Sequence, residues 1–162
     1  VVSPNRMLGQ RGEGIKVALG AITGRRLGIA SQGLGISEAS LRAAARYAKE
    51  RTTFGRPIAS YQAIQWKLAD MAVDIAAARA LIRRAAWLKQ AGRPFASEAA
   101  MAKTVASEAA SRCANRAVQT LGGYGYIREY QVERYLRDAK ITELYEGTSE
   151  VQRIVIARAL LA

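Results

Sequence analysis

The feature that most constrains the fold is a proline-free stretch from Gly14 to Arg51 with a sustained apolar repeat. Leucine and isoleucine recur in it every seven residues in two rows. This spacing is typical of a helix that packs against other helices. The stretch therefore predicts one long helix with a bundle-type seam. The two rows are Leu27, Leu34 and Leu41, and Ile22, Ile29 and Ile36.

Several glycines interrupt this predicted helix, although each lowers helix propensity by about 1 kcal/mol relative to alanine. Something must therefore approach that face of the helix closely. Two neighbours fit the pattern equally well: another helix, or a flavin or acyl thioester lying over the backbone. The glycines are Gly20, Gly24, Gly28, Gly33 and Gly35.

The rest of the chain repeats the helical pattern between clear breaks. Gly55 with Pro57, and Gly92 with Pro94, mark two turns. No segment alternates in the way of a strand, so the fold class is all-α, an antiparallel four-helix bundle with a short additional helix. Further helices are predicted over about 60–91, 97–121, 130–137 and 149–161.

Residues 1–12 contain Pro4, Asn5 and two glycines, and we expect them to form a linker that enters the bundle domain, residues 13–162. The chain begins at Val1 without an initiator methionine or an apolar leader. We therefore expect a piece of a longer chain and not a secreted precursor. No apolar run reaches the roughly 18 to 20 residues that cross a bilayer, so no membrane association is expected.

Cysteine and histidine usage excludes several kinds of site. Cys113 is the only cysteine, which rules out an intrachain disulfide and fits a reducing compartment. The chain has no histidine, so no metal site and no Ser-His triad are expected. Cys113 is read as core packing, because no histidine is present to activate it.

The chain carries a net charge of +12, from 25 Lys and Arg against 13 Asp and Glu. This balance indicates an anionic partner: nucleic acid, an acidic protein, or a phosphorylated cofactor such as FAD or coenzyme A. The basic residues are scattered along the helices and form no block. Nucleic acid is therefore an unlikely partner, and solvated faces with a few phosphate contacts are favoured.

One carboxylate near the C-terminal end is a candidate catalytic base. Glu146 precedes Gly147, where the backbone can turn sharply, and Ser149 with Gln152 has the spacing of a capping box, so a helix should begin at about Ser149. Beside Tyr145, the carboxylate would be partly desolvated and its pKa raised, as a base for a weak carbon acid requires. The alternative, which these residues alone favour, is an exposed glutamate that interacts with the helix dipole.

The segment Tyr145–Arg153 resembles the C-terminal signature of the acyl-CoA dehydrogenase family. Two further segments agree with this family in order and spacing, and the similarity runs through essentially the whole chain. The segments are Arg51–Ile58, followed by Gln62 and Leu68–Met71, and Gln119–Tyr126. The resemblance implies a C-terminal domain of the short- or medium-chain-like branch, with the linker coming from a missing middle domain.

The resemblance implies that Glu146 removes the pro-R α-proton of an acyl-CoA thioester while a hydride leaves the β-carbon for N5 of FAD. The product is a trans-2-enoyl-CoA. Tyr145, Gly147 and Arg26 are implied to contact the substrate; the alternative for Arg26 is a buried arginine paired with an acid. The isovaleryl and long-chain branch carries its base at the position of Arg25, which is no carboxylate, so Glu146 is the candidate that fits.

Cofactor contacts also follow from the resemblance. In the family, Arg51 and the segment Gln119–Gly123 reach the FAD of a neighbouring subunit, which implies a homodimer or tetramer. For Arg51 the residues alone favour an arginine that interacts with the dipole at a helix C-terminus. For Gln119–Gly123 a plain helix cap would look the same. The residues implied to bind FAD are Arg51, Phe54, Gln62, Gln119, Leu121, Gly122, Gly123, Thr148 and Glu150.

The family further implies a role in fatty acid β-oxidation, with electron-transferring flavoprotein as acceptor, in the cytoplasm or, in a eukaryote, the mitochondrial matrix. We expect the isolated domain to fold but to be inactive and to retain FAD weakly. Two alternatives from other classes are a relative that binds nucleic acid through its basic helices and a purely structural bundle that forms oligomers.

Overall fold

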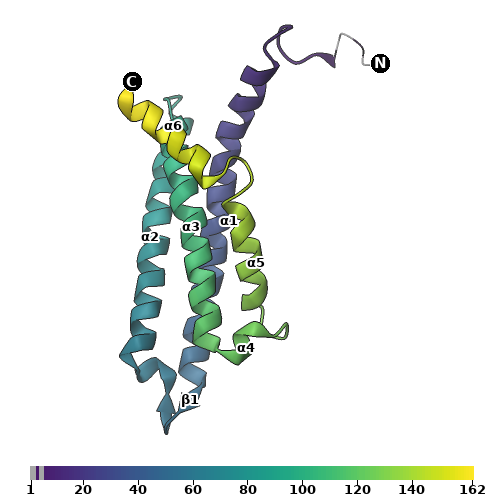
Figure 1. Ribbon diagram of the computed structural model, residues 1–162. Coiled ribbons are helices and arrows are strands. Elements are labelled where there is room, and N and C mark those ends of the chain that lie inside the picture. The colour runs from purple at the N-terminus through teal and green to yellow at the C-terminus, as the bar shows by residue number, and fades with distance from the viewer. Residues whose placement is uncertain (1–2, 4–5) are drawn as a thin grey trace.

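A single helix, α1 (Gly14–Glu50), runs the whole length of the molecule and confirms the long helix predicted from the apolar repeat (Figure 1). The computed structural model describes residue 3 and residues 6–162. Pro4 and Asn5, on which the linker prediction partly rests, lie outside the described residues. Towards its N-terminus α1 projects beyond the other helices (Figure 1).

Four helices, α1, α2, α3 and α5, run alternately up and down, which confirms the all-α antiparallel bundle (Figure 1). Helix α3 lies at its centre, with contacts to α1, α2, α5 and α6. The last helix, α6, crosses one end of the bundle (Figure 1). The bounds are α2 (Gln62–Gln90), α3 (Ala96–Leu121), α4 (Gly123–Tyr126), α5 (Val132–Thr142) and α6 (Ser149–Leu161), with a 3-10 turn at Ile58–Ser60.

A short hairpin at the other end differs from the sequence expectation, which contained no strand. Strands β1 (Thr52–Thr53) and β2 (Arg56–Pro57) pair antiparallel. Phe54 and Gly55 make the turn with φ of 49° and 79°. Strands of two residues are too short to produce an alternating pattern, so the sequence holds no signal for them.

Small side chains let α1 and α3 approach closely. A Cβ on Gly33 would lie 2.8 Å from the carbonyl oxygen of Ala106, so only glycine fits there. For Gly33 the close neighbour is therefore another helix. Around Gly20, Gly28 and Gly35 the space is open, so no neighbouring helix among the described residues requires a glycine at these three positions.

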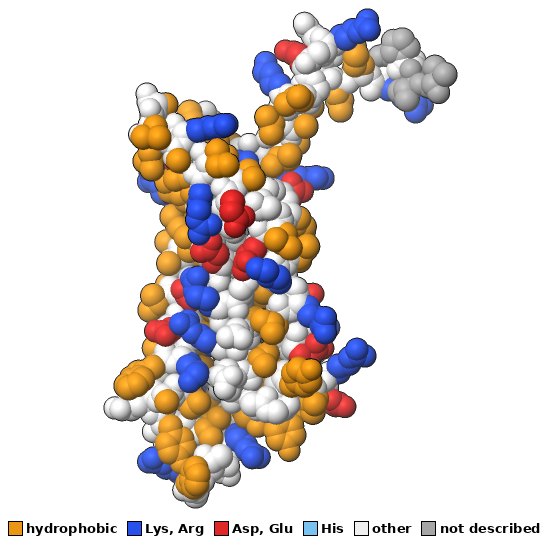
Figure 2. Space-filling model, in the orientation of Figure 1, with side chains coloured by type: hydrophobic (Ala, Val, Ile, Leu, Met, Phe, Trp, Pro, Cys, Tyr) orange, Lys and Arg blue, Asp and Glu red, His pale blue; other side chains and the backbone are white. Residues whose placement is uncertain are grey.

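The surface is divided by chemical type. On the face drawn in Figure 2, acidic and basic side chains of both signs mix across the middle of the bundle, while apolar side chains gather towards its two ends. Among the described residues, none of the helices combines the length and apolar character needed to cross a membrane.

Candidate active site and cofactor pocket

The turn between α5 and α6 holds Glu146 in an uncommon backbone conformation. Glu146 and Gly147 have φ of 54° and 94°, and the first value is in the left-handed region that few non-glycine residues adopt. A Cβ on Gly147 would lie 2.6 Å from Nε2 of Gln152, so a larger residue would displace this amide as well as strain the backbone. The chain therefore makes a tight turn at these two residues.

Hydrogen bonds from three residues fix this turn. Nζ of Lys103 and Nε2 of Gln152 each donate to the carbonyl oxygen of Gly147 at 2.8 Å. The backbone N–H of Ser149 donates to the carbonyl oxygen of Glu143 at 3.0 Å and closes the loop. Strained backbone of this kind persists where surrounding contacts determine it, and it concentrates at functional sites.

The helix start predicted at Ser149 is confirmed, but the predicted capping box is wrong. The N-cap is Thr148, whose hydroxyl accepts a hydrogen bond of 3.4 Å from the backbone N–H of Val151. Ser149 is already the first helical residue. The amide of Gln152 does not turn to a cap N–H, because it donates to the carbonyls of Glu146 and Gly147.

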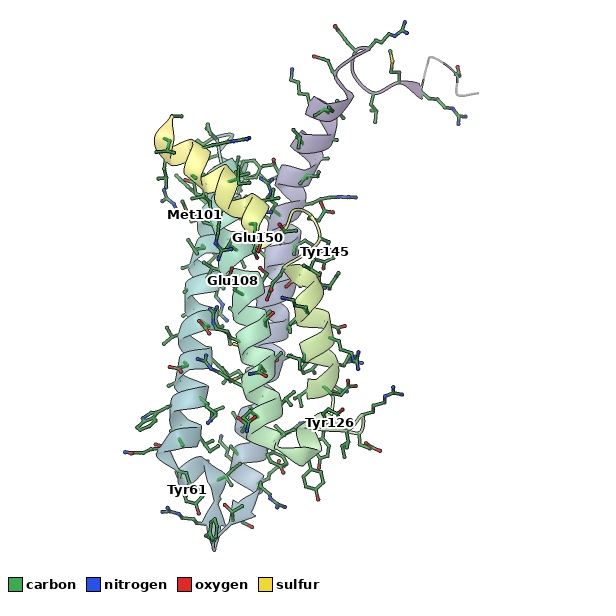
Figure 3. All side chains as sticks on the ribbon, viewed as in Figure 1. Tyr61, Met101, Glu108, Tyr126, Tyr145 and Glu150 are labelled. Atoms are coloured by element: carbon green, nitrogen blue, oxygen red, sulfur yellow. The ribbon has the colours of Figure 1, made fainter. Side chains whose placement is uncertain are left out.

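The side chain of Glu146 is 21% exposed, and its Oε1 lies 3.4 Å from Nη1 of Arg25. A largely covered carboxylate argues against the freely exposed glutamate that the residues alone favoured. The contact also brings Glu146 next to Arg25, the position at which the resemblance implies the base of another branch. The neighbouring Tyr145 donates its hydroxyl hydrogen to the side-chain oxygen of Gln32 on α1, and Figure 3 places Tyr145 in the loop beside that helix.

Two basic side chains are buried near the turn. Arg26 is 6% exposed and Lys103 is fully buried. Burial lowers the pKa of both groups; for Lys103 the carboxylate of Glu143 acts in the opposite direction. Among the described residues no acid pairs with Arg26, so the alternative of an arginine paired with an acid is not what the structure contains.

Buried polar atoms without a partner gather around the same turn. Within the described part of the chain there are four, and three of them are Nε of Arg26, Oγ of Ser149 and Oε1 of Gln152. Such atoms are rare in folded proteins, because each costs desolvation free energy without a compensating hydrogen bond. Their clustering is typical of a site that takes up a further polar group.

Thr148 and Glu150 are both predicted to contact the cofactor. Thr148 is the N-cap of α6, and Glu150 lies in the first turn of that helix (Figure 3). The pKa of Glu150 is held below its usual value by hydrogen bonds from its own backbone N–H and from the Thr148 hydroxyl. The carboxylate thus takes up part of the donor capacity that a helix N-terminus offers to an anion.

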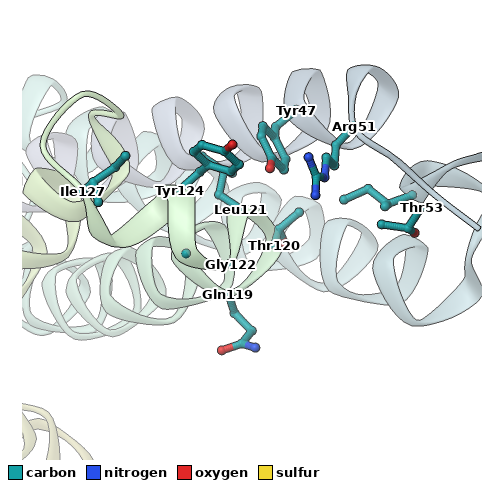
Figure 4. A pocket seen from close by; sticks show the side chains of 11 residues that line it. Tyr47, Arg51, Thr53, Gln119, Thr120, Leu121, Gly122, Tyr124 and Ile127 are labelled. Carbon is teal, nitrogen blue, oxygen red and sulfur yellow. The ribbon is translucent and has the colours of Figure 1, made fainter.

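A separate pocket of about 490 Å³ lies at the opposite end of the bundle (Figure 4). It is formed by the end of α1, the hairpin, and the junction of α3 with α4. Five of the residues predicted to bind cofactor line this pocket: Arg51, Gln119, Leu121, Gly122 and Gly123. The structure therefore brings together two segments that lie far apart in the sequence.

Arg51 and aromatic side chains shape one wall of this pocket. The guanidinium carbon of Arg51 lies 5.9 Å from the ring centroid of Tyr124. The rings of Tyr47 and Tyr124 pack together with their centroids 6.4 Å apart. Figure 4 shows the side chain of Gln119 pointing away from Arg51. A Cβ on Gly122 would meet no atom within 4 Å. The backbone there is open to a ligand.

Sequence reasoning missed Tyr47 and Tyr124 in the pocket and Lys103 beneath the turn. Tyr47 precedes Arg51 by one helical turn, and this spacing is a signal that a search for aromatic neighbours would find. Lys103 is the one basic residue in the alanine-rich run from Ala99 to Ala106. A lysine in a run that is otherwise small and buried indicates a specific partner.

Phe54 and Gln62, also predicted to bind the cofactor, do not line this pocket. Phe54 is 98% exposed at the tip of the hairpin, and Gln62 is exposed at the start of α2. Nor do the turn and the pocket meet. Lys103 and Leu121 lie on the same helix α3, and at about 1.5 Å per residue they are about 27 Å apart.

Comparison with known proteins gives one family. Residues 12–161 match the model described as acyl-CoA dehydrogenase, C-terminal domain. The mitochondrial short-chain specific acyl-CoA dehydrogenase of Mus musculus is 52% identical over 99% of this chain and 39% of its own length. The acryloyl-CoA reductase (NADH) of Anaerotignum propionicum is 51% identical over 96% of this chain and 39% of its own length.

Two solved structures resemble this chain to the same degree. Butyryl-CoA dehydrogenase from Megasphaera elsdenii superposes with a TM-score of 0.98 at 52% identity, covering 99% of this chain and 42% of that one. A chain in a structure described as the electron transferring flavoprotein of Acidaminococcus fermentans gives the same TM-score, identity and coverage. The chain thus spans about two fifths of the length of these relatives. It belongs to the acyl-CoA dehydrogenase family and corresponds to the C-terminal domain of that family.

Proposed function

We propose that this chain is the C-terminal domain of a longer FAD-dependent acyl-CoA dehydrogenase, in which Glu146 removes the α-proton of an acyl-CoA thioester. The single observation that carries the proposal is the turn at Glu146. The side chain of Glu146 is 21% exposed, and its backbone is in the left-handed region. Lys103 and Gln152 stabilise this turn through hydrogen bonds to the carbonyl oxygen of Gly147. A general base needs this combination of fixed position and partial desolvation.

Residues around the turn are suited to hold a thioester. Arg26 is buried with its Nε unpartnered among the described residues, so a polar oxygen of a bound substrate would supply the missing hydrogen bond. Positive charge there also favours the enolate that forms when the α-proton leaves. Tyr145, fixed by its bond to Gln32, and Gly147 complete the substrate contacts that we assign to this chain.

FAD fits the residues present. The pocket at Arg51 combines a guanidinium, which pairs with phosphate oxygens, with aromatic rings and with open backbone at Gly122 and Gly123. When bound, FAD supplies the acceptor for the hydride that leaves the β-carbon. In our proposal Arg51 and Gln119–Gly123 hold the cofactor of a neighbouring subunit, while Thr148 and Glu150 border a second cofactor beside Glu146.

An exposed apolar stripe supports the homo-oligomer that this arrangement requires. Trp66, Val73 and Trp87 on α2 are 64%, 69% and 55% exposed. They repeat at multiples of seven residues and so share one face of the helix. Large exposed apolar residues on one face typically mark an interface. A second copy of the chain is the partner we propose for it.

The relatives' names support a short acyl chain as substrate, and electron-transferring flavoprotein as the acceptor. We place the protein in the cytoplasm of a bacterium or in the mitochondrial matrix of a eukaryote, since relatives of both kinds match. The alternatives of a nucleic-acid-binding or purely structural bundle are not favoured, because neither requires Glu146, Arg51 and Gln119–Gly123 together.

The test is anaerobic bleaching of the visible flavin band when acyl-CoAs of increasing chain length are added to the full-length protein. We expect rapid bleaching, fastest with short chains. A protein that carries no flavin, or whose flavin no acyl-CoA reduces, would contradict the proposal. Because one relative is named a reductase, a parallel sample receives NADH and a 2-enoyl-CoA; turnover only in that sample would assign the reverse reaction.

A further inference from the structure

Lys103 is a fully buried lysine whose position no catalytic step explains. It lies on α3 and is the largest side chain with almost no exposed surface among the described residues. Lysine is almost never fully buried unless it has a partner, because its ammonium loses strong hydration. The partner here is the carbonyl oxygen of Gly147, at 2.8 Å.

An ion pair does not account for this burial. The carboxylate with the strongest effect on the pKa of Lys103 is that of Glu143, but its two oxygens accept hydrogen bonds from Ser111 and Lys140. Among the described residues no carboxylate lies within 4 Å of Nζ of Lys103. The ammonium is therefore directed at the backbone of the turn that carries Glu146.

The geometry of the turn depends on that contact. The peptide that follows Glu146 is flanked by residues with φ of 54° and 94°. A relaxed backbone would leave the left-handed region at Glu146. Lys103 and Gln152 both bind the carbonyl oxygen of Gly147 and so oppose a rotation of this segment.

We propose that Lys103 is a positioning residue for the dehydrogenation: its ammonium holds the Gly147 carbonyl so that Glu146 points at the α-carbon of the bound thioester. The inference rests on the proposed function of Glu146. Lys103 itself touches neither substrate nor cofactor in this account. Its role is exercised through the backbone of residues 146 and 147.

Replacing Lys103 with methionine preserves most of the volume of the side chain and removes the donor. In the full-length enzyme assayed with butyryl-CoA, we expect Lys103→Met to lower kcat about 10- to 100-fold, since small misplacements of a catalytic group have effects of this size. KM and flavin content should change little. With α-deuterated butyryl-CoA, the isotope effect on flavin reduction should rise, because removal of the α-proton becomes slower.

Lys140→Met is the matched control. Lys140 also lies beside Glu143, at 2.6 Å, but it donates to neither carbonyl of the turn. We expect its kcat to stay within about twofold of the wild type, because an exposed ion pair contributes little. If Lys103→Met does not fold, Lys103→Leu replaces it, since leucine also removes the donor and is readily buried.

The outcomes separate the two proposals. An active wild type whose Lys103 variants have normal kcat and isotope effect would overturn the positioning role alone. A loss of folding in both Lys103 variants would also overturn it, since the residue would then be structural. A wild type in which no acyl-CoA reduces the flavin would overturn the proposed function, and the role of Lys103 with it.

Discussion

Around Glu146, the contacts that fix the turn come from four helices of this chain: α1 supplies Arg25, α3 supplies Lys103, α5 ends at the turn and α6 supplies Gln152. Around Arg51, at the other end of the bundle, the chain supplies one wall. Phe54 there is almost fully exposed and Gln119 points away from Arg51 (Figure 4).

The difference separates two kinds of site. Left-handed backbone and a buried ammonium are maintained by tertiary contacts that this domain makes for itself. Exposed side chains beside an open pocket acquire a fixed position only when a ligand or another chain covers them. We infer that the domain contributes a preorganised base, while its cofactor pocket is completed by other parts of the enzyme.

The largest expected effect is on the turn. In the full-length enzyme, Glu146→Gln should slow flavin reduction about 10²- to 10⁴-fold, the range that general-base catalysis contributes. Because Arg25 lies 3.4 Å from the Glu146 carboxylate, adding Arg25→Glu to this variant should restore part of the rate. Stopped-flow measurement of the flavin band would decide. A double variant as slow as Glu146→Gln would mean that the two positions do not share one site.

The second prediction concerns the pocket at Arg51, where a substitution should weaken cofactor binding without changing the rate of proton removal. Arg51→Ala should weaken FAD binding about 10- to 100-fold, since a charged hydrogen bond contributes about 1.5–3 kcal/mol. Flavin reduction at saturating FAD should stay near the wild-type rate. Equilibrium dialysis measures the affinity. Arg56→Ala is the control, because Arg56 stacks on Tyr61 at 4.2 Å and does not line the pocket; an equal loss in both variants would count against a specific role for Arg51.

A third prediction concerns the close contact between α1 and α3, the two long helices that extend from one site to the other. Gly33→Ala should destabilise the chain by about 1–3 kcal/mol, the usual cost of overpacking, because the added Cβ meets the carbonyl of Ala106 at 2.8 Å. Gly28→Ala meets no atom within 4 Å and should stabilise the helix by up to about 1 kcal/mol. Urea unfolding compares them. Equal midpoints would show that the close approach is absent in solution.

The smallest effect is at Cys113, buried in the core between the two regions. Burial raises the pKa of its thiol from 9.0 to about 11. As the pH rises above 9, the unfolded chain loses this proton first, so stability should fall by about 1.4 kcal/mol per pH unit until about pH 11. Cys113→Ala should lack this component of the slope. Urea unfolding at pH 9 and 10 would detect it, and parallel slopes would contradict it.

Local patterns predicted most of the fold. The helices follow from the apolar repeats and the Gly and Pro breaks, and the last one begins at Ser149 as expected. The helix predicted over 130–137 instead runs from Val132 to Thr142. Its later end depends on tertiary burial of Ala139 and Thr142 against neighbours that the local sequence does not reveal.

The candidate site was predictable only in part. The assignment of Glu146 as base rests on the resemblance more than on its turn and stays a prediction, while the two segments that the structure brings together in the pocket were both identified. The contact behind the role proposed for Lys103 was not predictable, since Lys103 precedes Gly147 by 44 residues and only the packing of α3 beneath the turn joins them. The capping role of Ser149 was assigned wrongly because Thr148 competes for the same function and takes it.

The most direct test of the central claim isolates proton removal from hydride transfer. Acetyl-CoA has α-protons but no β-carbon, so incubation with the full-length enzyme in D₂O reports the base alone, through deuterium uptake measured by mass spectrometry. The account predicts uptake with the wild type and with Arg51→Ala saturated with FAD, and none above background with Glu146→Gln. Uptake by Glu146→Gln at the wild-type rate would contradict Glu146 as the base.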